Sequence, residues 1–286
     1  MTSLKIAENI NSTIKLNDGT VMPMFGLGVY RIDNMCSDLI AAALDQGYSL
    51  IDTAEFYNNE RDVGVAIKQS SRRREDVFVI SKWWPTSAGA KGVMDSLDNC
   101  LKHLESSYVD LYMIHAPKDG CCAEAYRALT QAKKEGKIKS LGVSNFGVHH
   151  LEALVKLGLE KPSVNQIQIH PWHQNNDIVY YCRENDITIV GYSPLAKAKK
   201  ITDETLVEIA QKLSKSPAQI LIRWSVQHGF ITIPKTSQVS RLELNADVFN
   251  WSIPDEDMKK LDALSDQPWS CTWDPTKNSL EEAGFE

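Results

Sequence analysis

The chain alternates short apolar runs with stretches in which apolar residues recur at helical spacing. The apolar runs are mostly continuous, as in strands that are covered on both faces. They predict strands at residues 25–29, 50–53, 77–81, 110–115, 140–144, 164–168, 188–192 and 230–234. The amphipathic stretches predict helices at residues 36–46, 61–69, 93–104, 124–135, 149–157, 177–184 and 204–213. This order predicts an α/β fold, a closed (β/α)8 TIM barrel rather than an open sheet.

Four segments fall outside this repeat. Residues 14–21 carry an Asp-Gly turn between short alternating runs, which predicts a β-hairpin that plugs the N-terminal end of the barrel. Residues 217–228 and 255–264 predict two extra helices, and residues 265–286 predict an irregular, aromatic C-terminal tail. Because no internal repeat or linker interrupts the chain, residues 1–286 are expected to form one domain.

Composition narrows the classes of function. Hydrophobic residues make up 43% of the 286 positions and charged residues 24%, a balance typical of globular proteins. The formal net charge of −6 argues against a general nucleic-acid binder. No run approaches the roughly 20 apolar residues of a membrane span, and the first twelve residues have no signal-peptide core. We therefore expect a cytoplasmic protein that binds neither nucleic acid nor membrane.

Reactive side chains stand near the ends of three consecutive predicted strands. Asp52 and Tyr57 accompany the second strand, Lys82 follows the third, and His115 ends the fourth. Each has an ordinary structural interpretation taken alone: a helix cap, rim packing, a solvated charge or a buried core histidine. Active sites of such barrels lie at the C-terminal ends of the strands, so all four are expected at one mouth. Their convergence favours catalysis.

From about residue 15 to residue 249 the sequence resembles the aldo-keto reductase superfamily. The motifs that carry the resemblance occur in order along the chain and are Asp-Thr-Ala-Glu-Phe-Tyr at 52–57, Lys-Trp-Trp at 82–84, Gly-Val-Ser-Asn-Phe at 142–146, Asn-Gln-Ile-Gln-Ile-His-Pro at 165–171, Tyr-Ser-Pro-Leu at 192–195 and Ile-Pro-Lys-Thr at 233–236. The resemblance implies a barrel that binds NADPH or NADP+ and reduces aldehydes and ketones to alcohols.

The resemblance also implies roles for the four reactive residues. Carbonyl reduction needs a hydride from a nicotinamide and a proton for the developing alkoxide. Tyr57 would donate that proton, and His115 would orient the carbonyl oxygen. A free tyrosine titrates near pH 10, so the Lys82 cation is expected to lower the pKa of Tyr57, while Asp52 keeps Lys82 charged.

Ten further residues are implied in cofactor binding. Ser144, Asn145 and Gln166 would hydrogen-bond the carboxamide, and Tyr192 would stack on the nicotinamide ring. The remaining set comprises Ser193 and Leu195 along the pyrophosphate, Lys235, Thr236 and Arg241 at the 2′-phosphate, and Asn245 at the adenine. Leu244 stands where the family usually has Glu, which predicts a weaker grip on adenine. NADPH is still expected to be preferred over NADH, because the 2′-phosphate suits charged donors.

The substrate pocket is expected to include Tyr30, Phe56, Trp84 and Ala116. Ala116 replaces a frequent Trp and should widen the pocket. Trp172, Trp269 and Trp273 are candidates for completing an aromatic wall. The expected partner is a small-molecule carbonyl substrate of medium size, and the protein is expected to be a monomer.

Two other functions compete with this interpretation. A metal-dependent barrel hydrolase would need His-x-His on the first strand, which has no His, so no metal is expected. A cofactor-binding regulatory or structural relative with little turnover, channel β-subunit-like or crystallin-like, is the alternative. The intact set of four reactive residues favours the enzyme.

Overall fold

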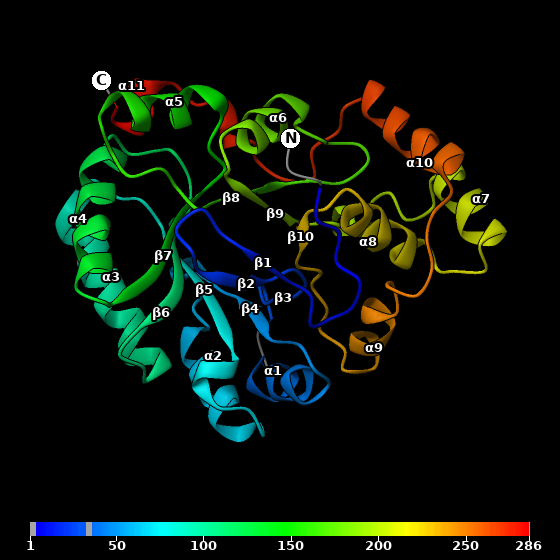
Figure 1. Cartoon of the computed structure of the whole chain (residues 1–286), viewed down its shortest axis with the longest axis horizontal. Helices are drawn as coiled ribbons and strands as arrows, with labels where there is room; N and C mark the ends of the chain where they lie inside the picture. The colour runs from blue at the N-terminus through cyan, green and yellow to red at the C-terminus, as the bar shows by residue number, and fades with distance from the viewer. Residues whose placement is uncertain (1–3, 33–35, 286) are drawn as a thin grey trace.

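The computed structural model describes residues 4–32 and 36–285 (Figure 1). Eight parallel strands lie in chain order around one curled sheet. They are β3 (Leu27–Gly28), β4 (Leu50–Asp52), β5 (Phe78–Trp83), β6 (Val109–Ile114), β7 (Ile138–Ser144), β8 (Val164–Gln168), β9 (Thr188–Tyr192) and β10 (Ile231–Thr232). Phe25, just before β3, bridges in parallel to Thr232 of β10 and joins the first strand to the last. The (β/α)8 barrel that the sequence predicts is confirmed.

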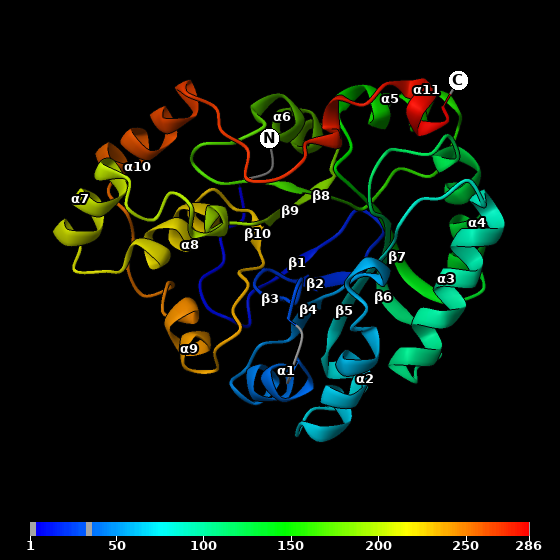
Figure 2. The same cartoon turned by 180° about the vertical axis from the view of Figure 1, so that it is seen from behind.

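Helices surround the strands on the outside (Figures 1 and 2). They are α1 (Cys36–Asp45), α2 (Glu60–Gln69), α3 (Gly89–Leu104), α4 (Cys122–Lys134), α5 (Val148–Lys156), α6 (Asn176–Glu184), α7 (Glu204–Lys212), α8 (Pro217–Gln227), α9 (Ser240–Ala246), α10 (Asp255–Asp262) and α11 (Leu280–Ala283). Every residue of β5, β6 and β8 is buried, as expected for strands with the barrel interior on one side and helices on the other.

An N-terminal hairpin closes the end of the barrel opposite the C-terminal strand ends. Its strands, β1 (Thr13–Lys15) and β2 (Val21–Pro23), pair antiparallel as the sequence predicts. Asp18 in the turn accepts hydrogen bonds from Lys133 of α4 at 2.9 Å and from Ser140 of β7 at 2.8 Å. Burial alone would raise the pKa of Asp18, but these bonds, with one from Thr20, lower it to about 2. The ionised turn therefore fastens the hairpin to the barrel.

The two helices predicted outside the repeat, at residues 217–228 and 255–264, are observed as α8 and α10. α8 begins at a capping box, in which the Ser216 side chain accepts from the Gln219 backbone and the Gln219 side chain accepts from Ser216. α10 runs into the 3-10 helix η4 (Ala263–Asp266). The described helices are all too short or too polar to cross a membrane.

Helical pieces also occur where the sequence predicts none. α9 has seven residues, and the tail, expected to be irregular, contains the 3-10 helix η5 (Pro275–Lys277) and the single turn α11, which lies beside α5 (Figure 1). Side-chain caps start the two tail elements, with Asp274 accepting from the Thr276 amide and Ser279 from that of Glu282. Such short elements have too few turns to produce a hydrophobic period.

Candidate active site

A cavity of about 490 Å³ opens among the segments that follow the C-terminal ends of the strands. Of the 18 residues assigned to catalysis, cofactor binding and the substrate pocket, all but Lys82 and Asn245 line it. The predicted residues in the lining are Tyr30, Asp52, Phe56, Tyr57, Trp84, His115, Ala116, Ser144, Asn145, Gln166, Tyr192, Ser193, Leu195, Lys235, Thr236 and Arg241. The barrel thus brings together residues from widely separated parts of the chain.

Lys82 lies beneath this cavity and is completely buried. Its Nζ donates to Asp52 Oδ2 at 2.7 Å and to the carbonyl oxygen of Thr53 at 2.8 Å. Burial lowers the pKa of Lys82, and the Asp52 carboxylate opposes that shift. Asp52 Oδ2 also accepts a hydrogen bond from Gln166 Nε2 at 2.7 Å. Asp52 is thus the counter-charge that lets an ammonium group exist inside the barrel.

Tyr57 ends the 3-10 helix η1 (Glu55–Tyr57), directly after β4. Its ring centroid lies 5.0 Å from Lys82 Nζ and 5.6 Å from the His115 ring. Burial raises the pKa of Tyr57 well above its ordinary value, and the Asp52 charge adds to the shift. The sequence predicts the opposite direction, from Lys82 alone. That direction is wrong because burial, the largest cause, and the charge of Asp52 beside Lys82 both raise the pKa, so the hydroxyl keeps its proton at neutral pH.

His115 follows β6 and faces Tyr57 across the cavity floor. Burial, with the Lys82 charge, holds the pKa of His115 well below its usual range, so its imidazole is neutral. Its Nδ1 is buried and has no hydrogen-bond partner among the described residues. A neutral imidazole carries one N–H, which is a suitable donor to a carbonyl oxygen in the cavity.

Polar side chains from β7, β8 and β9 meet on another side of the cavity. Ser144 Oγ donates to the carbonyl oxygen of Gln166 at 2.9 Å, and Asn145 Nδ2 donates to that of His115 at 2.9 Å. The Tyr192 hydroxyl donates to Asn145 Oδ1 at 2.8 Å. Asn145 has a φ of +61°, a left-handed conformation that Asn tolerates better than most residues. These bonds fix amide and hydroxyl groups beside the Tyr57–His115 pair.

The segment after β10 contributes the basic part of the lining. Lys235 and Arg241 are exposed at the mouth, and neither forms an ion pair with a carboxylate of the described residues. Thr236 between them is buried. Asn245 is buried on α9 outside the lining, and its neighbour Leu244 is 57% exposed. The structure therefore brings Lys235, Thr236 and Arg241 to the cavity and leaves Asn245 behind it.

The aromatic part of the lining lies around His115. The rings of Phe56 and Trp84 are stacked, with centroids 4.6 Å apart, and Trp273 of the tail lies 6.4 Å from Trp84. Trp172 and Trp269, the other two candidates, lie outside the lining, where the Trp269 amide donates to the carbonyl oxygen of Trp172 at 2.8 Å. Of the three Trp candidates, Trp273 therefore reaches the cavity.

Several lining residues are absent from the sequence prediction. Arg31, Lys197, Thr272 and Pro275 all line the cavity. Lys197 lies in the 3-10 helix η3 (Ala196–Ala198), whose three residues have φ between +48° and +59°. The lysine-rich sequence of that segment was the available signal for Lys197. Nothing in the pattern of the tail indicates that Thr272 and Pro275 fold back to the mouth.

The described residues offer no cluster of metal ligands. Within residues 4–32 and 36–285, no three His, Cys, Asp or Glu side chains are grouped so that they could hold a metal ion. The chemistry of the lining is that of a phenol, a neutral imidazole, a buried ion pair and exposed cations.

Known proteins are similar to this chain over most of its length. The sequence model of the aldo/keto reductase family matches residues 33–266. Glyoxal reductase of Bacillus subtilis is 41% identical over 90% of this chain and 94% of its own length. Methylglyoxal reductase DkgA of Escherichia coli is 37% identical, over 88% of this chain and 93% of its own. The crystal structure of MGS-M4, an aldo-keto reductase from a Medee basin deep-sea metagenome library, gives a TM-score of 0.87 at 38% identity and covers 93% of this chain and 99% of its own.

Proposed function

The chain belongs to the aldo/keto reductase family of carbonyl-reducing oxidoreductases, and from that premise we propose that it reduces aldehydes and ketones with NADPH and with Tyr57 as the proton donor. The observation that carries this proposal is the meeting of Tyr57, His115 and the Lys82–Asp52 pair at one cavity floor. A protonated phenol beside a neutral imidazole can protonate a carbonyl oxygen that the imidazole N–H holds in place.

Each of these side chains has a separate task. A bound nicotinamide supplies the hydride. Tyr57 holds the proton at its hydroxyl, whose pKa burial raises, and would pass it to the substrate oxygen. His115 donates an N–H and fixes the orientation of the oxygen. Lys82 and Asp52 position the Tyr57 ring from below and provide a cation 5.0 Å from it as charge develops.

The polar side of the cavity supports the binding of a nicotinamide. Gln166 Nε2 is occupied by Asp52, so Oε1 is the atom that Gln166 would offer to a carboxamide N–H. Ser144 and Asn145 lie beside it, and Tyr192 supplies the aromatic face on which the ring would stack.

The basic side supports NADPH rather than NADH. Four cations reach the lining from the segments after β3, β9 and β10: Arg31, Lys197, Lys235 and Arg241. Among the described lining residues, Asp52 is the one carboxylate, and Lys82 already compensates it. We assign Lys235, Thr236 and Arg241 to the 2′-phosphate, because an extra phosphate gains most from unpaired cations. Ser193 and Leu195 would follow the pyrophosphate, and Asn245 would approach the adenine.

The aromatic part of the lining supports a carbonyl substrate with a flat or apolar body. Glyoxal and methylglyoxal appear in the names of two relatives, and we propose small dicarbonyls and medium-sized aldehydes as substrates here. We also propose a monomer in which residues 1–286 form a single domain with residues 265–286 as its tail.

The direct test follows loss of NADPH absorbance with 4-nitrobenzaldehyde, in parallel with NADH and with Tyr57→Phe. We expect NADPH-preferring turnover, and a loss of about 10²–10⁴-fold in kcat for Tyr57→Phe with the NADPH dissociation constant unchanged. Undiminished turnover in Tyr57→Phe would show that Tyr57 is not the proton donor. Tight NADPH binding without reduction of any aldehyde in a broad panel would support the binding-protein alternative instead.

A further inference from the structure

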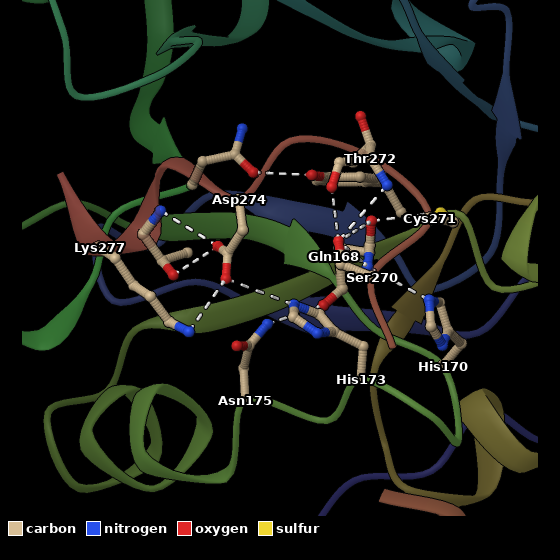
Figure 3. Close-up of polar contacts among 12 residues, drawn as sticks. Gln168, His170, His173, Asn175, Ser270, Cys271, Thr272, Asp274 and Lys277 are labelled. Carbon is tan, nitrogen blue, oxygen red and sulfur yellow. Dashed lines mark hydrogen bonds and ion pairs between the residues drawn. The ribbon is translucent and has the colours of Figure 1, made fainter. Parts of the chain in front are cut away.

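The C-terminal tail lines part of the cavity and is hydrogen-bonded to the end of β8 (Figure 3). At the start of this stretch, the backbone N–H of Trp269 donates a hydrogen bond to the carbonyl oxygen of Trp172 at 2.8 Å. Beyond it, Thr272, Trp273 and Pro275 line the cavity. This stretch of the tail supplies one wall of the aromatic end of the cavity, so its position determines the shape of that end.

Gln168, the last residue of β8, is the main attachment point. Its Nε2 donates to Ser270 Oγ at 3.0 Å, and its Oε1 accepts from Cys271 Sγ at 3.2 Å. Ser270 Oγ in turn donates to the carbonyl oxygen of Thr272 at 2.7 Å. The Gln168 side chain is buried and uses both ends of its amide on consecutive tail residues (Figure 3). It therefore sets the direction in which the chain enters the mouth.

A second attachment follows the lining stretch. Asp274 Oδ1 accepts from the amide and hydroxyl of Thr276, and Asp274 Oδ2 lies 4.0 Å from His173 Nε2 (Figure 3). Asn278 Nδ2 donates to the carbonyl oxygen of Pro117 at 2.9 Å, beside the His115 segment. The stretch between Cys271 and Asp274 is thus held at both ends by side-chain contacts, with Gln168 at one end and with the His173 and Pro117 segments at the other.

Trp273 depends on these attachments because little packing holds its side chain. It is 51% exposed, and its ring contact is the tilted one with Trp84, at 6.4 Å between centroids. A half-exposed indole with one ring neighbour takes its position from the backbone that carries it. Release of the Gln168 attachment would therefore move Trp273, while Tyr57, His115 and the Lys82–Asp52 pair, which stand on other strands, would stay in place.

We propose that Gln168 is a positioning residue for substrate selectivity, which acts by fixing Trp273 at the aromatic end of the cavity. The proposal rests on the carbonyl reductase function given above. Substrates with a flat aromatic body reach Trp273 and gain a ring contact there. Two- and three-carbon dicarbonyls react at Tyr57 and His115 without reaching it. Gln168 therefore favours aromatic aldehydes over the smallest carbonyl compounds.

The experiment compares 4-nitrobenzaldehyde with methylglyoxal in the full-length protein. Gln168→Met keeps the side-chain length and removes the hydrogen bonds to Ser270 and Cys271 of the tail, together with the 3.2 Å contact to His170 Nε2. We expect the KM for 4-nitrobenzaldehyde to rise about five-fold, the size of one lost aromatic contact. Its kcat, the KM for methylglyoxal and the NADPH dissociation constant should stay within about two-fold, as expected if only substrate positioning has changed.

Three further variants separate positioning from a general structural role. Cys271→Ser keeps a donor toward Gln168 Oε1 and should retain wild-type selectivity, whereas Cys271→Val should lose part of it. Trp273→Ala should raise the same KM, and adding Gln168→Met to it should have no further effect. Additive effects in that double variant, or equal losses with both substrates, would overturn the proposal.

If Gln168→Met does not fold, Ser270→Ala provides the same test, because it removes the tail hydroxyl that accepts from Gln168 Nε2. An unchanged KM for 4-nitrobenzaldehyde in a folded Gln168 or Ser270 variant would also overturn the proposal. Failure of the proposed function has a different signature, because the wild-type protein would then reduce neither substrate.

Discussion

Gln166 and Asp52 are joined across the interior of the barrel, with Gln166 Nε2 2.7 Å from Asp52 Oδ2. They stand on β8 and β4, four strands apart in the eight-stranded sheet. The same oxygen also accepts from Lys82 at 2.7 Å. One carboxylate oxygen thus connects the residue proposed to hold the nicotinamide with the cation beneath the proposed proton donor.

Removing the Asp52 charge should destabilise the protein strongly. Asp52→Asn leaves the buried Lys82 ammonium without a counter-charge, and breaking such a pair typically costs about 3–5 kcal/mol. We expect the free energy of unfolding in urea to fall by this amount and the pKa of Lys82 to fall further. Asp52→Asn combined with Lys82→Met should recover most of the lost stability while remaining inactive. An equal loss in the double variant would show that the pairing is not the cause.

Arg241 should determine the preference between the two nicotinamide cofactors. It lines the basic end of the cavity and forms no ion pair with a described carboxylate. Because a hydrogen bond to a charged group contributes about 1.5–3 kcal/mol, Arg241→Ala should lower kcat/KM for NADPH about 10- to 100-fold. The value for NADH should change less than about two-fold, and Arg127→Ala, at an exposed position of α4, should change neither. Equal losses for both cofactors would place Arg241 away from the 2′-phosphate.

Lys197 should make NADPH binding dependent on salt. It lines the cavity, whereas Lys199, two residues on, is exposed and lies outside the lining. Lys197→Ala should weaken NADPH binding about five-fold at low ionic strength, and the difference should shrink as salt screens the charge. Quenching of tryptophan fluorescence can follow the titration, and Lys199→Ala serves as the matched control. Similar effects of both substitutions would indicate a general surface potential and no contact by Lys197.

Asp18 should contribute to stability in a way that depends on acid pH. Its folded-state pKa of about 2 lies below the ordinary value of 3.8 for an aspartate, so the contribution is present above about pH 4 and is lost as pH falls toward 2. We expect Asp18→Asn to lose about 1–2 kcal/mol of unfolding free energy at pH 7, after allowance for solvent screening. Urea unfolding at several pH values should show this difference vanish near pH 2. Asp266→Asn, at an exposed position in η4, should show no such trend.

Repetition in the sequence made the barrel predictable. Each of the eight predicted strands overlaps an observed strand, because continuous apolar runs and amphipathic helices recur with one regular order. The site followed from the same order, since residues at C-terminal strand ends share one mouth. In the structure Lys82, inside β5, forms an ion pair with Asp52 at the end of the neighbouring β4.

Features that depend on three-dimensional surroundings were not predictable in this way. The raised pKa of Tyr57 reflects burial and the compensation of Lys82 by Asp52, neither of which a sequence displays. The fold-back of Thr272 and Pro275 to the mouth depends on the side-chain attachment at Gln168, which has no periodic signature. The left-handed turn at Lys197 is similarly a local backbone arrangement without a glycine to announce it.

The closure between β3 and β10 gives the barrel an uneven resistance to local opening. Both strands have two residues, and the backbone hydrogen bonds that Gly26, Gly28 and Thr232 donate across this junction measure 3.1–3.2 Å. Segments held by few hydrogen bonds open first in folded proteins, so among the barrel strands amide hydrogen exchange should be fastest here. Arg31 follows one of these strands and Lys235 the other. An anion bound by both side chains would link the two strands. Anion binding would then stabilise the closed barrel, and the closed barrel would favour anion binding.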